Sequence, residues 1–285
     1  MIRSGSELVG RGKKRTKVTL RTTIAFLICV PFVYPFYFLV VTAFKSNSDY
    51  IHNELGIPHP FVITQFLTAW RSVDLGQAMI DSTIAATVSV IVLIVLTAPA
   101  AEWCARTRSR RKSIVLGIVA VVWMVPVIIW IIPLFVELSV VHLTNSDVVL
   151  GVVYGVANAP LGLYLLYAYL ADAIDPQIRE AAAVDGATPK RVFFSISLPL
   201  SLPVLSTVAV LGFVFAWGDV LIAAVLLQSS NTWTVPLAAT SFTSRMGIAL
   251  QAEAAAALLS MLPLAVLFVI FQKGIVRGLT VGSGR

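Results

Sequence analysis

Long apolar runs separated by short polar segments are the dominant pattern of this chain. Six runs lack Asp, Glu, Lys and Arg for about the ~20 residues that an α-helix needs to cross a bilayer. The six runs are Thr22–Phe44, Ser82–Ala101, Ser113–Val136, Val148–Ala171, Leu200–Gly218 with a continuation to Leu227, and Ala254–Gln272. The pattern predicts an all-α integral membrane protein with six transmembrane helices.

The basic residues are distributed unevenly among the polar segments. Eighteen of the 21 Lys and Arg lie before the first run, between the second and third runs, in segment 175–203 and after the sixth run. Because segments rich in Lys and Arg stay in the cytoplasm, we expect both termini and segment 175–203 on that side. The predicted organisation is a basic cytoplasmic tail over residues 1–21, a six-helix transmembrane domain over 22–273 and a cytoplasmic tail over 274–285.

The composition agrees with a location in the membrane. Hydrophobic residues make up 58% of the 285 residues and charged residues 12%, against about 45–50% and 25% in soluble proteins. We therefore expect a multi-pass protein of the cell membrane with little length left for a soluble domain. The net charge of +7 is explained by the basic cytoplasmic segments, so it does not indicate a nucleic acid partner.

Segment 175–203 is a polar island between apolar runs, and its residues predict a helix, a turn and a second helix. Asp175 can cap a first helix that has Pro176 at its first position. Gly186 can adopt the left-handed conformation that ends a helix, and Thr188 can cap the next one. Prolines at positions 199 and 203 are expected to break or kink the way out of the segment.

The same segment contains a spaced motif: Glu-Ala-Ala, three residues, Gly, nine residues, Ile, one residue, and Leu-Pro. It falls on Glu180, Ala181, Ala182, Gly186, Ile196, Leu198 and Pro199. This spacing resembles the EAA loop of the membrane subunits of ATP-binding-cassette (ABC) importers. Asp185 next to Gly186, and the ending Pro-Leu-x-x-Pro, are similar to the carbohydrate-importing, maltose-permease-type branch.

The resemblance implies a type I ABC importer fold and a permease subunit that moves a carbohydrate or related solute into the cell. It also implies partners: a homologous second permease subunit, a dimer of ATPase subunits that bind ATP and Mg²⁺, and an external solute-binding protein or lipoprotein. This chain would itself carry no catalytic residue and no cofactor. Segment 175–203 would dock on the ATPase through Glu180, Ala181, Ala182, Asp185, Gly186, Ile196, Leu198 and Pro199.

One carboxylate lies well inside an apolar run, at Asp219. A charge at that depth costs roughly 2.5–3.5 kcal/mol on insertion scales, so we expect Asp219 to face a cavity or a partner. Its surroundings resemble the Trp-Asn-Glu-Phe segment of the sugar-permease branch, with Gly218 and Asp219 as departures from it. On a helix Phe215 shares a face with Asp219, whereas Trp217 points about 200° away. Phe215 and Asp219 are therefore candidates for lining a translocation path.

The fourth run has a face of small residues and one amide. Small side chains let membrane helices approach closely, so this face predicts a helix interface. Together with the alanines of the sixth run, it leads us to expect that another subunit fills much of the interface. Asn158 either forms a hydrogen bond between helices or lines the translocation path. The small residues are Gly151, Gly155, Ala159 and Gly162.

Three other features give local expectations. Glu102 can form an ion pair with Arg106 one helical turn later. Pro126 and Pro133 are expected to kink the third run. Segment 46–75 contains several aromatic residues, which indicate either a belt at the membrane interface or a docking surface for an external binding protein.

The alternative function is a self-sufficient secondary transporter or channel. Such proteins usually have several buried charges or inverted repeats, whereas here Asp219 is almost alone. A membrane enzyme or metal site is not expected, because the histidines lie in loops without a metal-binding pattern. The histidines are His52, His59 and His142. Cys29 and Cys104 have no metal-ligand spacing, and we expect no disulfide between them.

Overall fold

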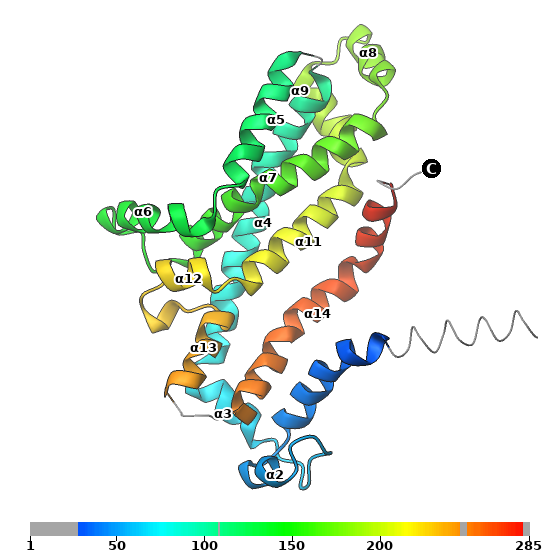
Figure 1. Ribbon diagram of the computed structural model, residues 1–285. Coiled ribbons are helices and arrows are strands. Elements are labelled where there is room, and N and C mark those ends of the chain that lie inside the picture. The colour runs from blue at the N-terminus through cyan, green and yellow to red at the C-terminus, as the bar shows by residue number, and fades with distance from the viewer. Residues whose placement is uncertain (1–27, 108, 246–249, 282–285) are drawn as a thin grey trace, which may run out of the picture. The chain divides into compact units, whose positions relative to one another are not determined.

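The computed structural model describes residues 28–107, 109–245 and 250–281 (Figure 1). Every regular element within these ranges is a helix. The chain divides into two compact units, residues 1–69 with 248–258, and residues 70–247 with 259–285. The predicted basic tail over residues 1–21 lies outside the described residues.

The first unit contains the apolar helix Ile28–Ala43 and the segment that follows it. The short helices α2 (Asn47–His52) and α3 (Thr64–Ser72) lie in that segment, with the end of α3 in the second unit. Buried Lys45 donates hydrogen bonds through Nζ to the carbonyl oxygens of Asn53 and Glu54. Its side chain therefore holds the segment in a defined fold.

Part of the aromatic content of segment 46–75 is used inside this unit. The ring of Phe44 lies 4.9 Å from that of Phe66 and 5.8 Å from that of Phe61, between centroids. These rings therefore pack on one another. Trp70 and Ile57 are exposed, so a belt and a docking surface both stay open as interpretations of the rest.

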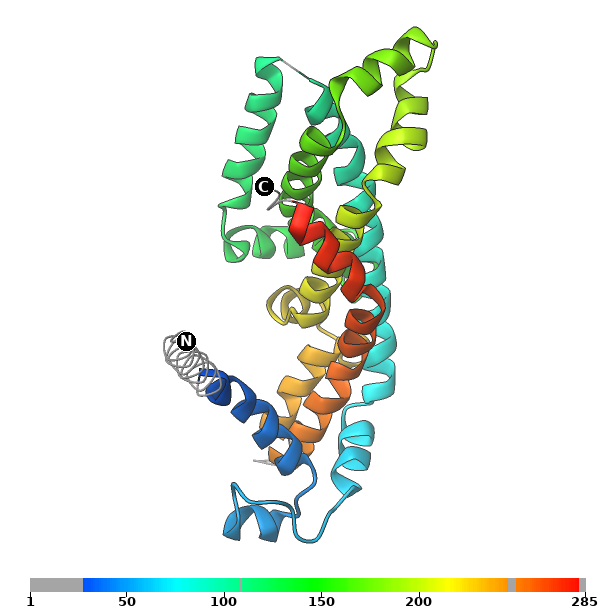
Figure 2. The same cartoon turned by 90° about the vertical axis from the view of Figure 1, so that its right-hand side faces the viewer.

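The second unit is built around α4 (Leu75–Arg106), α7 (Asp147–Ala173) and α11 (Leu202–Gly218), which lie side by side (Figure 1 and Figure 2). The backbones of α4 and α7 approach closely at glycines. A Cβ added to Gly151 would lie 2.6 Å from the carbonyl oxygen of Ala85, and one on Gly155 would lie 2.8 Å from that of Ser89. The predicted small-residue interface is thus confirmed. The expectation that another subunit fills it is wrong for this face, because α4 of the same chain occupies it.

The third apolar run is broken rather than kinked. It forms α5 (Arg110–Trp123) and α6 (Val127–Val140), which are bent by 87° relative to each other. The break precedes Pro126, which has no N–H group and disfavours the helical conformation at the residue before it. Pro133 lies inside α6, which continues through it.

The end of the chain contains more helix than the sequence indicated. The stretch between the fifth and sixth apolar runs contains the 3₁₀-helix η2 (Ser230–Thr232) and α13 (Val235–Arg245). The last helix, α14, is Leu250–Val281, so residues 274–281 of the expected tail continue a helix.

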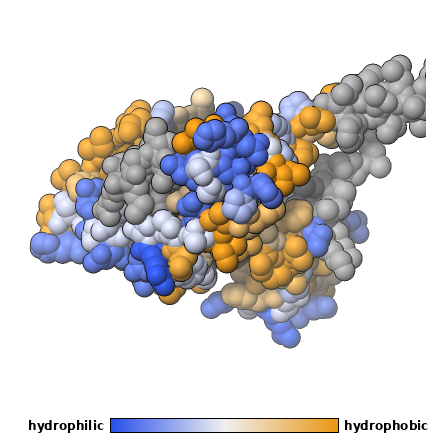
Figure 3. All heavy atoms as spheres, turned by 90° about the horizontal axis from the view of Figure 1, so that it is seen from below, coloured by the Kyte–Doolittle hydropathy of each residue, from blue (hydrophilic) through white to orange (hydrophobic). Residues whose placement is uncertain are grey.

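Three helices of the described residues are long and apolar enough to cross a membrane: α4, α7 and residues 250–272 of α14. Counting each of two bent helix pairs as one span raises the number to five. The expected first span begins at residue 22, outside the described residues, so the count of six stays a prediction. Large apolar side chains such as Val95 and Val121 are exposed, and the face seen in Figure 3 shows patches of hydrophobic residues beside hydrophilic ones. Such a surface suits contact with lipid.

Candidate coupling site

The first helix of segment 175–203 is α8 (Pro176–Val184), and it begins as the sequence predicts. The side-chain Oδ1 of Asp175 accepts a hydrogen bond from the N–H of Gln177 at 2.8 Å. Pro176 stands at the first helical position, where its missing N–H group leaves no intrahelical bond unmade. Asp175 and Pro176 therefore fix where the chain turns from α7 into α8.

The helix ends in a Schellman motif around Gly186, whose φ is +76°. The N–H of Gly186 donates to the carbonyl of Ala183 at 3.1 Å, and that of Ala187 donates to the carbonyl of Ala182 at 2.9 Å. A Cβ at Gly186 would meet no atom within 4 Å. The demand for glycine therefore comes from the left-handed backbone and not from crowding.

The outer surface of α8 is exposed at one end of the second unit (Figure 1). Glu180 and Ala181 are exposed, and Val184 is 88% exposed, the highest value among the large apolar side chains that the structure describes. Glu180 forms no ion pair with any residue that the structure describes. This helix therefore presents a carboxylate, a thin alanine surface and an isolated valine outward.

The second half of the segment is one bent helical path. It runs through α9 (Pro189–Val192), the π-helix η1 (Phe193–Ser197) and α10 (Leu198–Leu200), and then turns by 74° into α11. Thr188 caps α9 by accepting a hydrogen bond from the N–H of Arg191 at 3.3 Å. The predicted helix, turn and helix are thus confirmed. The wide turn of η1 comes directly before α10, which contains Pro199; a proline ring at this position would otherwise press on the preceding helical turn.

Of the motif residues at the end of this path, Leu198 is half-buried and Pro199 is exposed. Buried Val192 begins the wide turn, and Phe193 and Leu198 pack against an apolar cluster formed by α4, α7 and α11. Ile196 is half-buried. These contacts attach the second half of the segment to the membrane helices, while α8 stays outward.

An ion pair that the sequence did not predict joins α8 to α4. Nη2 of Arg179 lies 3.2 Å from Oε2 of Glu102, and both side chains are largely buried. Nη1 of Arg179 also donates to the carbonyl of Ile174, at 3.4 Å. The expected pair between Glu102 and Arg106 is present at 3.8 Å. Arg179 and Glu102 are 77 residues apart, so only the tertiary structure identifies them as partners.

The candidate path residues meet at another place, around Tyr154 of α7. Helix α11 ends at Gly218, and Oδ1 of Asp219 accepts hydrogen bonds from Tyr154 Oη at 2.9 Å and from the N–H of Ile222 at 2.9 Å. A third bond comes from the N–H of Ala223 at 3.2 Å. Asp219 therefore caps α12 (Leu221–Leu226), and its expected partner lies within its own chain.

Phe215 and Asn158 also contact Tyr154. The ring of Phe215 lies edge-on to that of Tyr154 with centroids 6.2 Å apart. Asn158 donates from Nδ2 to the backbone carbonyl of Tyr154 at 2.9 Å, so its amide bonds to its own helix and, among the described residues, to no other helix. Trp217 points elsewhere, stacking on Phe213 and donating to the carbonyl of Ser260. The predicted divergence of Trp217 from Asp219 is confirmed.

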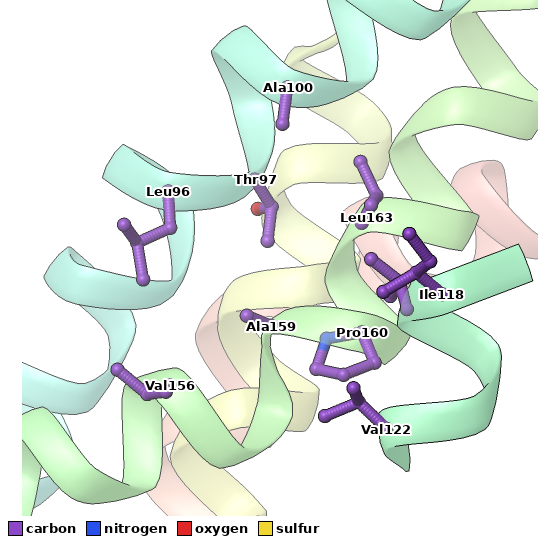
Figure 4. A pocket seen from close by; sticks show the side chains of 10 residues that line it. Leu96, Thr97, Ala100, Ile118, Val122, Val156, Ala159, Pro160 and Leu163 are labelled. Carbon is purple, nitrogen blue, oxygen red and sulfur yellow. The ribbon is translucent and has the colours of Figure 1, made fainter. Parts of the chain in front are cut away.

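Two cavities of the second unit do not resemble a site for a polar solute. The cavity beside Asn158 has about 10 Å³, close to the lower limit for one water molecule. A larger cavity of about 220 Å³ lies between α4, α5 and α7 (Figure 4). Its only hydroxyl, on Thr97, already donates to the carbonyl of Leu93. Ligand sites for polar molecules need several convergent polar groups, so this apolar cavity does not suit a sugar.

Comparisons with known proteins agree on one family. The permease protein MelC of Bacillus subtilis (strain 168), named for melibiose/raffinose/stachyose import, is 28% identical over 273 residues, covering 96% of this chain and 99% of the relative. A putative ABC transporter permease protein, ORF1 of Streptomyces antibioticus, is 33% identical over 227 residues, covering 80% of this chain and 99% of the relative.

The fold has a solved counterpart. The crystal structure of a bacterial ABC transporter involved in the import of the acidic polysaccharide alginate matches with a TM-score of 0.75 at 17% identity, over 96% of this chain and 99% of the other. This likeness concerns the fold, which is that of an ABC importer permease. Residues 94–281, which include the whole of segment 175–203, match the family described as "Binding-protein-dependent transport system inner membrane component". The chain therefore belongs to this family of inner membrane transport components.

Proposed function

We propose that this chain is one of two membrane subunits of an ABC importer that carries a carbohydrate or a related polyol into the cell. MelC, similar over nearly its whole length, is named for the import of melibiose, raffinose and stachyose. The other components would be a homologous permease, an ATPase dimer that binds ATP and Mg²⁺, and an external solute-binding protein. In this proposal the chain itself catalyses no reaction.

The observation that carries the proposal is the geometry of α8. Its start and its end are fixed by Asp175 and Gly186, while Glu180, Ala181 and Val184 are exposed on a helix that projects from one end of the unit. A short helix with fixed ends, small side chains and a carboxylate that pairs with no described residue suits insertion into a cleft of another protein. We propose that this protein is the ATPase, with Ala182 and Asp185 completing the docking helix.

The second half of the segment would then transmit a displacement of α8 to the membrane helices. Ile196, Leu198 and Pro199 lie on the helical path that bends by 74° into α11. Because Leu198 packs against the apolar cluster of the membrane helices, a displacement of α8 would reach α11 as a rigid-body movement.

We also propose that Phe215 and Asp219 border the translocation path. Phe215 is 40% exposed and Asp219 is half-buried, so an aromatic face and the second carboxylate oxygen of Asp219 are accessible next to each other. Aromatic faces and a few placed polar groups are what small-molecule sites use. Buried Asn158 would act on the path indirectly, through its hydrogen bond to the backbone carbonyl of Tyr154.

The test is reconstitution of the complete transporter with its ATPase, second permease and binding protein. ATP hydrolysis is measured with melibiose, raffinose and stachyose, and with an amino acid and an inorganic anion as controls. Stimulation by at least one sugar and by neither control supports the proposal. Uptake by this chain alone in liposomes, without ATP or partners, would instead show a secondary transporter.

A further inference from the structure

Arg179 is the one charged side chain of α8 that points into the protein. Its side chain is 12% exposed and that of Glu102 is 5% exposed, whereas Glu180 on the same helix is exposed. Arg179 is not part of the spaced motif in segment 175–203. The side chain therefore has a role different from that of the residues that face outward.

The contacts of Arg179 reach the ends of two membrane helices at once. Nη2 binds the carboxylate of Glu102 in the last turns of α4 at 3.2 Å, and Nη1 binds the carbonyl of Ile174, directly after α7, at 3.4 Å. Helices α4 and α7 are held closely together, since the glycines of α7 leave no room for a Cβ against the backbone of α4. Arg179 thus attaches α8 to a rigid pair of helices.

Stability alone does not explain this ion pair. Among the described residues, buried Nε of Arg179 makes no hydrogen bond, and buried Oε1 of Glu102 is approached only by Nε of Arg106, at 3.8 Å; the pair is therefore incompletely hydrogen-bonded. Buried ion pairs are weak contributors to stability, because the cost of removing the two charges from water can exceed their attraction. A directional link between two elements is a better account of a charge pair at this place.

We propose that the Arg179–Glu102 pair is a strut that transmits the displacement of α8 to the α4–α7 helix pair, in parallel with the path through Leu198 and α11. This inference rests on the coupling function proposed above. Two connections at different points of segment 175–203 would transmit a movement of α8 both to the ends of α4 and α7 and to the start of α11. Arg179 and Glu102 are positioning residues in this account, and neither contacts substrate or ATP.

The first test uses the purified full-length chain. Arg179→Ala should raise the hydrogen–deuterium exchange of α8 amides and the mobility of a spin label at Val184→Cys. The matched control is Arg106→Ala, which removes the other positive charge next to Glu102 without touching α8. Arg106→Ala should leave α8 unchanged. Equal α8 mobility in the Arg179→Ala variant and the unmodified chain would overturn the strut.

The second test uses the reconstituted transporter, with raffinose as the first probe and the other sugars of the panel as alternatives. Arg179→Ala and Glu102→Gln should keep the ATPase bound in stoichiometric amount and reduce sugar-stimulated hydrolysis by roughly tenfold, within the 5- to 150-fold range of typical coupling energies. The double variant should reduce the sugar-stimulated hydrolysis no more than either single variant does, because each substitution removes the same Arg179–Glu102 contact. Arg179→Lys, which retains the charge, should recover part of the stimulation.

The outcomes separate the two proposals. Loss of stimulation in Arg106→Ala as great as in Arg179→Ala would overturn the strut, because it would show that Glu102 needs only a neutralising charge. Full stimulation in Arg179→Ala would overturn it as well, while leaving the docking function of α8 intact. An unmodified transporter without bound ATPase, or unresponsive to every sugar, would overturn the proposed function and the strut with it.

Discussion

Segment 175–203, proposed above as the coupling segment, and the break between α11 and α12 at Asp219 both begin a new helix in the same way. In each, a carboxylate caps a short helix after a long membrane helix has ended: Asp175 accepts from the N–H of Gln177 at 2.8 Å, and Asp219 accepts from the N–H of Ile222 at 2.9 Å. They differ in what else holds the carboxylate. Asp175 is exposed, while Asp219 also receives the hydroxyl of Tyr154, which is 65 residues away.

Because of this difference, we expect that α8 can move relative to the membrane helices, whereas the break at Asp219 can move only together with them. Helix α8 is fixed within itself by its caps, and its side-chain hydrogen bonds to the membrane helices come from Arg179. The break at Asp219 is tied into the core by three donors to one oxygen. Changes in the coupling segment should therefore affect partner binding first, and changes at Asp219 should affect stability first.

The comparison depends on the coupling segment being cytoplasmic. The measurement is labelling of Lys190→Cys by a membrane-impermeant thiol reagent, in a chain in which Cys29 and Cys104 are replaced by Ser. We expect no labelling in intact cells and full labelling after permeabilisation, because basic segments stay inside. The control is Leu55→Cys in segment 46–75, which is 53% exposed and should be labelled in intact cells. Labelling of Lys190→Cys from outside would contradict the assigned topology.

The next largest effect is expected in the coupling segment itself. Gly186→Val should abolish co-purification of the ATPase while the chain still inserts, because φ of +76° costs a residue with a Cβ roughly 1 kcal/mol or more and shifts the direction of α8. Glu180→Lys should have a similar effect by reversing the charge of the exposed face. Uptake and ATPase retention are the measurements.

Matched variants sharpen that experiment. Gly117→Val is the control, because Gly117 also has nothing within 4 Å of a Cβ but lies inside α5 without a positive φ. Gly186→Asn should retain the ATPase, because Asn tolerates the left-handed conformation. If Gly186→Val and Glu180→Lys both keep stoichiometric ATPase and full stimulation, segment 175–203 is not the coupling element.

In these two regions the sequence predicted the interactions between residues that are close along the chain, but not those between residues that are far apart along it. The caps of α8 and α9 depend on residues within six positions of one another, so Asp175, Gly186 and Thr188 could be assigned from spacing alone. The partners of Glu102 and Asp219 could not, because Arg179 and Tyr154 come near them only when α4, α7 and α11 pack. A polar side chain in an apolar run signals that a partner exists, without identifying it.

The same reasoning explains the misjudged interface of α7. The face with Gly151 and Gly155 indicated close approach of a helix, and the structure confirms this. A periodic pattern on one helix carries no information about which helix approaches, so the assignment to another subunit had no physical basis in the sequence. The sequence predicted a kink between α5 and α6 but not the size of the bend, which is 87°. The reason is related: Pro126 determines where a helix breaks but not by how much.

A moderate effect is expected at the break. Asp219→Leu should lower the stability of the chain by roughly 1–3 kcal/mol, because Tyr154 and two backbone N–H groups lose their acceptor. Asp219→Asn should retain the cap, since Asn is as good an N-cap as Asp, and should alter transport or its substrate range. The measurements are thermal unfolding in detergent and uptake by the complete transporter. Unchanged stability and normal transport in Asp219→Leu would contradict both roles of the carboxylate.

The smallest effect is expected for Tyr154→Phe. This variant removes one of three donors to Asp219 and retains the ring that lies against Phe215, so the loss should be about 0.5–1.5 kcal/mol, the net value of one hydrogen bond. Because the two N–H groups of α12 still hold the carboxylate in place, transport should fall less than in Asp219→Asn. Tyr164→Phe is the matched control, since it removes another hydroxyl of α7, one that donates to the carbonyl of Leu116 in α5. If Tyr154→Phe impairs transport more than Asp219→Asn does, with stability unchanged, the hydroxyl itself contacts the solute and the break is part of the path and not a fixed joint.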